Sequence, residues 1–429
     1  MRLVYLHQYF KFPNEMGGTR SYDLAKSFSL NNHSVTVLTT TSDLAYKSKK
    51  RWNILQRDGL FVHYIYLPYE NQMSYARRML TFFQFLYFSS LHLLKQNCDI
   101  VLATSTPLTI GIPALVKKWI HKTPFVFEAR DVWPEAVIAI GAIKNRILQK
   151  LLYRLEKMIY KNASAIVPLS SDMKKSIVSR YPDIIHNKPV VVIENISEIN
   201  RFSKIQKSDI LKNAIGFKPR FSILYAGTFG RVNGIKYVVN LAQKTSAIDG
   251  SLVFILLGEG AMKEKVIQYA KEKSVLNKNV FILDSVSKQE LPDWYNEVNM
   301  VSSFVISIKE LWANSANKFF DTLAASRPVL INHDGWQAEV IKADKLGYVL
   351  PEVLTDRVVS QFVAYTQDSN LQKQHRENAY LKAKTSYSLE IAVQKYLNIF
   401  QYISNKQSKY PFFPLHNLSG SFRLILFSN

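Results

Sequence analysis

Short apolar runs alternate with amphipathic helical stretches along most of this chain, and the alternation limits its fold more than any other feature. It is typical of parallel sheets whose strands are joined by crossover helices, because strands covered on both faces are apolar throughout. A first series of such runs lies at 3–6, 34–40, 61–67, 100–103, 124–127 and 165–168. The helix-like segment RSYDLAKSFSLNN between the first two runs completes a βαβ unit.

A second series repeats the pattern, with runs inside 219–230, 251–260, 279–284, 300–306 and 327–335. The segment 190–219 between the two series is polar, lacks a long apolar period and is the expected linker. The predicted fold class is therefore α/β, with two Rossmann-like, doubly wound domains that face each other across a cleft. We predict a first domain at 1–195, a second at 196–375, and a C-terminal helix that packs back on the domains, with an apolar tail, at 376–429.

Charge and cysteine content narrow the class of protein. The chain has 55 Lys and Arg against 33 Asp and Glu, and the net charge of +22 favours membrane lipid, nucleic acid or a phosphorylated small molecule as partner. No helix-turn-helix, zinc or RNA-binding signature accompanies the charge, so a nucleic-acid-binding protein is a remote alternative. The one cysteine, Cys98, excludes a disulfide framework and a cysteine-based zinc cluster. We expect a cytoplasmic location without a signal peptide, since an apolar strand begins at once.

The turns after the apolar runs are candidate binding sites, because open α/β sheets bind ligands at the carboxyl ends of their strands. Gly17 and Gly18 follow the first run, and a glycine pair lets the backbone approach a ligand closely. We interpret the pair as facing a phosphate or an acceptor. An ordinary tight turn is the alternative.

The loop after the run at 124–127 carries Glu128, Arg130 and Asp131 together. At the mouth of a cleft, charged loop residues contact a ligand more often than the core. An ion pair that shapes the loop is the alternative. His7 also follows a strand, but it is isolated in the sequence, which favours a structural histidine.

The turn after the first strand of the second domain contains Gly227, Gly230 and Gly234. These glycines are three and four residues apart, whereas a dinucleotide fingerprint spaces them two and three apart. We therefore favour a sugar-nucleotide diphosphate as ligand. Arg231 in this turn offers a bidentate fork for phosphate oxygens.

The most informative stretch lies between the last two runs of the second series. We expect Asn314 or Ser315 to cap a helix that starts near Ala316, so that its first-turn N–H groups face the cleft. Lys318 and Asp321 are three residues apart on this helix and share a face. One could hold a diphosphate and the other the hydroxyl groups of a ribose. A surface ion pair between the two is the alternative.

Five segments together carry a resemblance to a known family: PNEMGGTRSYDLAKSFSLNNHSVTVLTT, FEARDVWPEAVIAIGAI, YAGTFG, LLGEG and NKFFDTLAASRPVLINHDGWQAEVI. In this order, over about residues 1–400, they resemble the family-4 glycosyltransferases of the GT-B fold, in a bacterial polysaccharide branch similar to fucosamine (amino-sugar) transferases. The resemblance implies a retaining hexosyltransferase that uses a UDP-sugar, with an N-acetylated amino or deoxyamino sugar favoured. It implies no metal and no further cofactor.

The resemblance also divides the candidate residues between the domains. It implies a donor site in the second domain, on Gly227, Arg231, Gly258, Glu259, Asn317, Lys318 and Asp321. It implies an acceptor or phosphate-facing site in the first domain, on Gly17, Gly18 and Glu128. The candidate catalytic residues are Arg130, Asp131 and Glu310.

The chain departs from the family pattern in three places. Of the family's two glutamates separated by seven residues, the second falls on Asp321 and the first on Ala313, which makes Glu310 the candidate stand-in. The first-domain histidine that many members use near the acceptor falls on Arg130. The usual basic pair of the second domain is displaced, and Arg231 is expected to compensate.

Two segments of the first domain suit a membrane surface. The uncharged run 79–94 has 16 residues, about 24 Å as a helix, which is short of the ~30 Å hydrocarbon core, so we expect it to be surface-lying or buried. Arg77, Arg78, Phe82 and Phe83 give this segment the composition of an interfacial helix.

The second segment carries a basic stripe of Lys150, Arg154, Lys157 and Lys161, which attracts anionic lipid. A core helix with a solvated basic face is the alternative for both segments. We expect a peripheral protein at the cytoplasmic face of the bacterial inner membrane that acts on an undecaprenyl-diphosphate-linked glycan in O-antigen or capsule biosynthesis. A sugar-nucleotide epimerase of the GT-B fold is the alternative enzyme.

Overall fold

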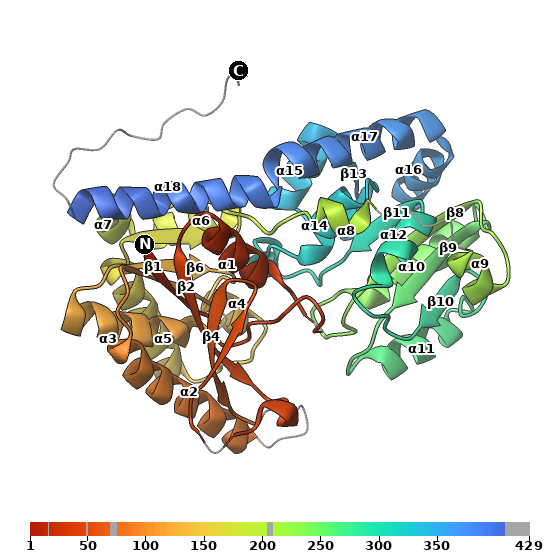
Figure 1. Ribbon diagram of the computed structural model, residues 1–429. Coiled ribbons are helices and arrows are strands. Elements are labelled where there is room, and N and C mark those ends of the chain that lie inside the picture. Colours follow the sequence, from red (N-terminus) through yellow and green to blue (C-terminus); the bar gives the residue numbers. More distant parts are fainter. Residues whose placement is uncertain (16, 49, 69–74, 106, 204–208, 408–429) are drawn as a thin grey trace, which may run out of the picture.

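The computed structural model describes residues 1–15, 17–48, 50–68, 75–105, 107–203 and 209–407. Two sheets, each flanked by helices, form two Rossmann-like domains, and Figure 1 shows them side by side. The predicted fold class is therefore confirmed.

The first sheet has seven strands in the order β3-β4-β2-β1-β5-β6-β7. Neighbouring strands are parallel except β3 and β4, which form an antiparallel pair at one edge. The strands are β1 (Arg2–Leu6), β2 (Ser34–Thr41), β3 (Asn53–Arg57), β4 (Leu60–Tyr66), β5 (Ile100–Thr104), β6 (Phe125–Ala129) and β7 (Ala165–Pro168). All six predicted apolar runs coincide with strands, and β3 is the addition.

Helices cover both faces of the first sheet (Figure 1). One face packs against α1 (Arg20–Leu30) and α18 (Leu389–Gln407), and the other against α2 (Tyr75–Lys95), α3 (Gly111–His121) and α5 (Arg146–Asn162). Shorter elements are η1 (Leu44–Tyr46), η2 (Leu108–Ile110), α4 (Glu135–Ala139), α6 (Ser171–Arg180) and α7 (Pro182–Ile185). The described part of the chain holds no helix with the length and apolar content needed to cross a bilayer.

The second sheet is parallel, with six strands in the order β10-β9-β8-β11-β12-β13. Its strands are β8 (Phe221–Ala226), β9 (Leu252–Leu257), β10 (Val280–Leu283), β11 (Met300–Ser303), β12 (Val329–Ile331) and β13 (Gly347–Val349). Its helices are α10 (Ile235–Ser246), α11 (Lys263–Glu272), α12 (Leu291–Glu297), α13 (Lys309–Trp312), α14 (Asn317–Ala324), α15 (Trp336–Asp344) and α16 (Asp356–Gln367). The expected linker carries two short helices, α8 (Ile199–Phe202) and α9 (Ile210–Ile215).

The C-terminal helices pack on both domains, as predicted. Ala379 and Ala383 of α17 (Ser369–Ser386) belong to an apolar cluster of the second domain. In α18, the rings of Tyr396 and Phe400 lie 5.6 and 5.3 Å from the ring of Phe28 in α1. The chain therefore crosses back to the first domain, as the long helix in Figure 1 shows. The predicted apolar tail from 408 onward lies outside the described residues.

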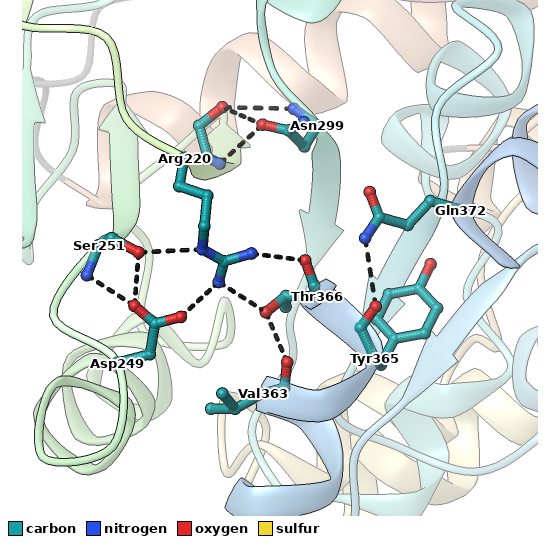
Figure 2. A network of polar contacts seen from close by, with 9 residues as sticks. Arg220, Asp249, Ser251, Asn299, Val363, Tyr365, Thr366 and Gln372 are labelled. Atoms are coloured by element: carbon teal, nitrogen blue, oxygen red, sulfur yellow. Dashed lines mark hydrogen bonds and ion pairs between the residues drawn. The ribbon is translucent and has the colours of Figure 1, made fainter. Parts of the chain in front are cut away.

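A polar network lies at the amino ends of β8 and β9, remote from the strand ends expected to bind ligand. Arg220, just before β8, donates to Asp249 (2.5 Å), to Ser251 (3.0 Å) and to the carbonyl of Thr366 (2.8 Å), as Figure 2 shows. Asp249 and Ser251 precede β9, so the network lies at the amino ends of the strands. Because open α/β sheets bind ligands at the carboxyl ends, we interpret this network as structural.

Candidate functional site

A cavity of about 450 Å³ lies between the two domains, and we call it the cleft cavity. It is lined by His7, Tyr9, Lys11, Gly17, Gly18, Arg130, Asp131, Leu169, Asn195, Asn314, Ser315, Ala316 and Asn317. These residues come from the segments after β1, β6 and β7, from the linker, and from the segment that leads into α14. The sheet order switches direction next to β1 in the first domain, and such a switch point is where open α/β sheets hold ligands.

The predicted glycine turn forms part of the cleft cavity and faces the second domain. Gly17 has a φ of +125°, which favours glycine. A Cβ atom on Gly18 would lie 3.2 Å from the side-chain nitrogen of Asn317, at the start of α14. The small residues therefore let the first domain approach this helix terminus.

The predicted capping of α14 is wrong. The helix begins at Asn317, and the residue before it, Ala316, provides no side-chain cap. The backbone that precedes it is instead held by the first domain, because the amide of Asn195 donates to the carbonyl of Ser315 (2.5 Å). The first-turn N–H groups of α14 consequently have no side-chain cap and adjoin the cleft cavity, an arrangement suited to an anion.

Lys318, in the first turn of α14, is a partly buried cation. Its Nζ lies 3.8 Å from the centre of the Tyr225 ring, and a Cβ atom on Gly227 would lie 2.6 Å from its Cε. Within the described residues, no carboxylate forms an ion pair with it. Burial lowers the pKa of Lys318 to about 7. An anion placed beside the side chain would stabilise its charged ammonium form and raise this pKa again.

Asp321 does not pair with Lys318, which removes the predicted alternative of a surface ion pair between them. Its Oδ1 instead accepts from Arg201 of α8 at 2.8 Å. Burial raises the pKa of Asp321 to about 6, although the Arg201 guanidinium opposes the shift. The two α14 side chains therefore contact different parts of the protein: Lys318 lies over the Tyr225 ring, and Asp321 pairs with Arg201. Contact of Asp321 with a ribose stays a prediction.

Of the eight predicted residues of the second domain, only Asn317 lines the cleft cavity; Gly227, Lys318 and Asp321 lie behind its wall, and the other four lie elsewhere. Gly258 packs tightly against the turn after β8, since a Cβ atom there would lie 1.9 Å from the carbonyl oxygen of Gly227. Glu259 is exposed and pairs with Lys263 at 2.5 Å. Arg231 and Glu310 are also exposed, the latter on the four-residue helix α13. The structure thus gives Glu310 no place in the cleft cavity as a stand-in for the family carboxylate.

The prediction that Glu128 faces an acceptor or a phosphate is wrong. Its side chain is fully buried, Arg20 donates to it at 2.8 Å, and the hydroxyl of Tyr396 also donates to it. Burial raises the pKa of Glu128, but the Arg20 and Arg130 guanidinium groups and the hydrogen bonds from Tyr396 and Thr104 together lower it below its ordinary value. Arg20 also donates to the carbonyl of Ile193 (3.0 Å). The network therefore joins β6, α1, the linker and α18, which makes it structural.

Arg130 and Asp131, from the same loop, both line the cleft cavity. The loop is held in place because the backbone N–H of Arg130 donates to the hydroxyl of Ser105 (2.8 Å). The cavity therefore has a guanidinium and a carboxylate on its first-domain wall. It also has Lys11 there, which the sequence analysis did not select.

The sequence analysis gave His7 and Asn195 no place in the cleft cavity and considered Ser315 only as a helix cap. Three of their side-chain atoms are buried without a hydrogen-bond partner among the described residues. They are Nδ1 of His7, which the sequence favoured as a structural histidine, Oδ1 of Asn195 and Oγ of Ser315. The position of His7 directly after β1 was a usable signal. No comparable signal marks Asn195, because only the packing of the two domains brings the linker and the α14 segment together.

The predicted membrane segments are helices of the first domain. In α2, Phe83 is exposed and Phe82 is partly buried, while the side chain of Arg78 lies outside the described residues. Arg77 is exposed at the start of the same helix. In α5, the four residues of the basic stripe are all exposed. Both helices thus keep part of their surface away from the core.

Two family models match consecutive parts of the chain. The model described as Glycosyltransferase Family 4 matches residues 17–201, and the model described as Glycosyl transferases group 1 matches residues 207–382. The first match falls on the first domain and its linker, and the second on the second domain.

Two curated proteins are similar to parts of the chain. They are the probable glycosyltransferase WbjE of Pseudomonas aeruginosa and the putative colanic acid biosynthesis glycosyl transferase WcaI of Escherichia coli K12. Each is 24% identical, over 41% and 37% of this chain respectively. The alignments span 43% and 40% of those relatives, which is less than half of their length.

The crystal structure of Anabaena HepE in complex with UDP-glucose is similar over the whole fold, with a TM-score of 0.67 and 15% identity. The match covers 95% of this chain and 99% of that one, and at such low identity it shows the shared fold. With both family models matched in order along the two domains, the chain belongs to family 4 of the GT-B glycosyltransferases.

Proposed function

We propose that this chain is a retaining hexosyltransferase that moves a sugar from a UDP-sugar to a membrane lipid-linked glycan. The UDP donor is supported by the likeness to HepE, which was solved in complex with UDP-glucose. An N-acetylated amino or deoxyamino sugar is the proposed group transferred, on the sequence resemblance alone. The proposal requires neither a metal ion nor a further cofactor.

The observation that carries the proposal is the ammonium of Lys318 beside the uncapped start of α14. When a glycosyl–phosphate bond breaks, negative charge develops on the diphosphate, so a fixed cation and N–H groups at that place lower the barrier. A diphosphate seated there would supply the counter-ion that Lys318 lacks among the described residues. Arg130, on the first-domain wall of the cleft cavity, provides a second cation.

Retention is proposed to proceed without a covalent glycosyl-enzyme. The family's first carboxylate falls on Ala313, which cannot act as a nucleophile. The acceptor hydroxyl then attacks the anomeric carbon on the face from which the diphosphate leaves. The bond from that carbon to the phosphate oxygen breaks, the bond to the acceptor oxygen forms, and the hydroxyl proton passes to the departing phosphate oxygen. Asp131 lines the cavity and is the proposed group that orients the acceptor.

The helices α2, α3 and α5 pack on one face of the first sheet (Figure 1). Each of them also carries exposed apolar side chains, which support a lipid-linked acceptor. They are Leu80, Phe83, Tyr87, Leu91, Trp119, Ile120, Ile147, Leu148, Leu151 and Met158. The helix α5 also carries exposed lysines and arginines, and anionic lipid attracts each such charge by about 1 kcal/mol. We therefore propose peripheral binding at the cytoplasmic face of the bacterial inner membrane.

The acceptor class proposed is an undecaprenyl-diphosphate-linked glycan of surface polysaccharide biosynthesis, such as O-antigen or capsule. The similarity to WcaI, a putative colanic acid biosynthesis glycosyl transferase, supports a polysaccharide pathway.

The transfer is tested by measuring UDP release from UDP-glucose and UDP-N-acetylglucosamine, with and without undecaprenyl-diphosphate-linked acceptors. We expect acceptor-dependent release that falls by about 10²-fold or more in Lys318→Met, because a preorganised charge on the leaving group is lost. Lys236→Met is the matched control, since Lys236 also lies over a tyrosine ring (5.1 Å from that of Tyr269) but is exposed on α10. Equal loss in both variants, or none in either, would contradict the role of Lys318. Conversion of the sugar nucleotide without acceptor would indicate an epimerase.

Membrane binding is tested by sedimentation with vesicles that contain phosphatidylglycerol or only phosphatidylcholine. We expect the chain to sediment with the anionic vesicles, and the double variant of Phe83→Ser and Tyr87→Ser to bind at least about tenfold more weakly, since two exposed apolar side chains are lost. The matched control is Ile248→Ser with Val353→Ser, which changes exposed apolar residues of the second domain. Unchanged sedimentation of the α2 variant would refute this surface.

A further inference from the structure

The start of α6, in the first domain, makes two hydrogen bonds to the second domain. The hydroxyl of Ser170 donates to the carbonyl of Ala313 at 2.7 Å. The carboxylate of Asp172 accepts from the backbone N–H of Trp336 at 2.7 Å. Both side chains come from one short stretch of chain, and we call the two contacts together the α6 clasp.

The α6 clasp gives α15 a cap that comes from the other domain. The helix begins at Trp336, and Gly335 before it provides no side-chain cap. The carboxylate of Asp172 satisfies the first N–H group instead, and its negative charge suits the positive end of the helix. Gly335 has a φ of +90°, and a Cβ atom on it would lie 2.9 Å from Oδ2 of Asp172. The glycine therefore lets the first domain approach this helix terminus.

The α6 clasp also holds the segment that leads into α14. The carbonyls of residues 313–315 precede this helix, and each accepts a hydrogen bond from a side chain. The first carbonyl accepts from Ser170 and the third from Asn195. The second accepts from the side chains of Trp336 and Gln337, at the start of the α15 helix that Asp172 caps. All three carbonyls are therefore fixed by the first domain, by its linker or by a helix that the clasp holds.

Fixed carbonyls orient the backbone that faces the cleft cavity. Because each peptide unit is planar and trans, a fixed carbonyl sets the direction of the N–H group of the next residue. The N–H groups of residues 314–316 are oriented in this way, and these residues line the cleft cavity just before α14. Neither Ser170 nor Asp172 lines the cavity, so both act on it through this segment.

We propose that Ser170 and Asp172 are positioning residues, which hold the start of α14 in the orientation that receives the diphosphate of the donor. The inference rests on the proposed function, because it takes the start of α14 as the diphosphate site. The Ser170 hydroxyl is fully buried, and Ala313 packs in an apolar cluster with first-domain residues, so water does not compete for their hydrogen bond. The donor site of the second domain thus depends on two side chains of the first.

The α6 clasp is tested by isothermal titration calorimetry of the full chain with UDP at pH 7. We expect Asp172→Ala to bind UDP about fivefold more weakly than the parent, as for the loss of one helix cap. The substitution removes a negative charge, which by itself favours an anion, so a loss of affinity has the sign that positioning predicts. Asp172→Asn keeps an acceptor oxygen and should bind UDP like the parent. Ser170→Ala should bind it at least about threefold more weakly, as for one lost hydrogen bond.

Two control variants separate positioning from a purely structural role. Lys175→Met removes the ion pair that Asp172 makes with Lys175 at 3.2 Å but leaves the cap of α15 in place. Asn145→Ala removes the side-chain cap of α5, which lies outside the cleft cavity. It should lower the Tm of the free protein, as Asp172→Ala does, because each variant loses one helix cap. Both controls should bind UDP with the affinity of the parent.

The outcomes separate the α6 clasp from the proposed function. If the parent does not bind UDP, the proposed function fails and the positioning role falls with it. If the parent binds UDP but Asp172→Ala and Ser170→Ala bind it equally well, the positioning role is refuted while the proposed function stands. A loss of affinity in Asn145→Ala equal to that in Asp172→Ala would refute the positioning role as well. Weaker binding in the two clasp variants, with parent-like binding in Asp172→Asn and in both controls, supports it.

Discussion

UDP binding is expected to weaken as the pH rises above 7, because the binding site takes up a proton at Lys318. Burial lowers the pKa of this lysine to about 7 in the free protein, so its ammonium is only about half formed at that pH. A diphosphate beside the side chain favours the charged form and raises the pKa again. Binding is therefore linked to protonation, and the affinity is highest below pH 7 and is lost as the pH rises through the pKa of the free protein.

The size of the effect follows from the same shift. If the bound diphosphate returns the pKa of Lys318 to its ordinary value, the affinity falls by about 15-fold between pH 7 and pH 8.5, which is about 1.6 kcal/mol. The second ionisation of a phosphate monoester has a pKa near 6, so the charge of UDP itself changes little over this range.

Isothermal titration calorimetry with UDP at pH 7.0, 7.5, 8.0 and 8.5 measures the slope, and buffers of different ionisation enthalpy measure the proton uptake. Lys318→Arg keeps its charge at every pH and should bind UDP with little pH dependence. Lys318→Met should bind weakly at every pH. An affinity of the parent that does not change from pH 7 to 8.5, or that rises, would refute the assignment of Lys318 to the diphosphate.

Other variants test the fold around the site. Glu128→Ala should lower the free energy of unfolding by about 3–5 kcal/mol in urea titrations, because it leaves the buried Arg20 without its counter-charge; a loss below about 1 kcal/mol would contradict the structural role. Tyr396→Phe should lower it by about 1.5–3 kcal/mol, since it removes a hydrogen bond to the same carboxylate, and equal stability to the parent would count against that bond. Gly227→Ala should weaken UDP binding in calorimetry by at least about tenfold, because its Cβ would displace the Lys318 side chain; unchanged affinity would show that this contact is unimportant.

The fold followed from the sequence because parallel strands buried on both faces leave an apolar signature. Every run selected in the first domain became a strand, whereas β3 escaped because Ile54 and Gln56 are exposed and the strand lies at the sheet edge. The return of the chain to the first domain was predictable from the helical period that places Tyr396 on one face of α18.

The site was less predictable, because it depends on contacts between segments far apart in the chain. Gly17, Arg130 and Lys318 could be selected, since each follows a strand or starts a helix in its own domain. The burial of Glu128 could not, because its partner Arg20 lies 108 residues earlier. The missing cap of α14 has the same origin, since Asn195 of the linker holds the backbone of the preceding segment.

The central claim is that the second-domain wall of the cleft binds the diphosphate of a uridine nucleotide. The most direct measurement is the shift of the Tm by UDP, GDP, ADP and NAD, each at about 100 times a micromolar Kd, where one site stabilises by about 2.7 kcal/mol. We predict stabilisation by UDP that is lost in Lys318→Met and kept in Lys236→Met. Stabilisation by NAD alone, or by none of the four nucleotides, would contradict the account.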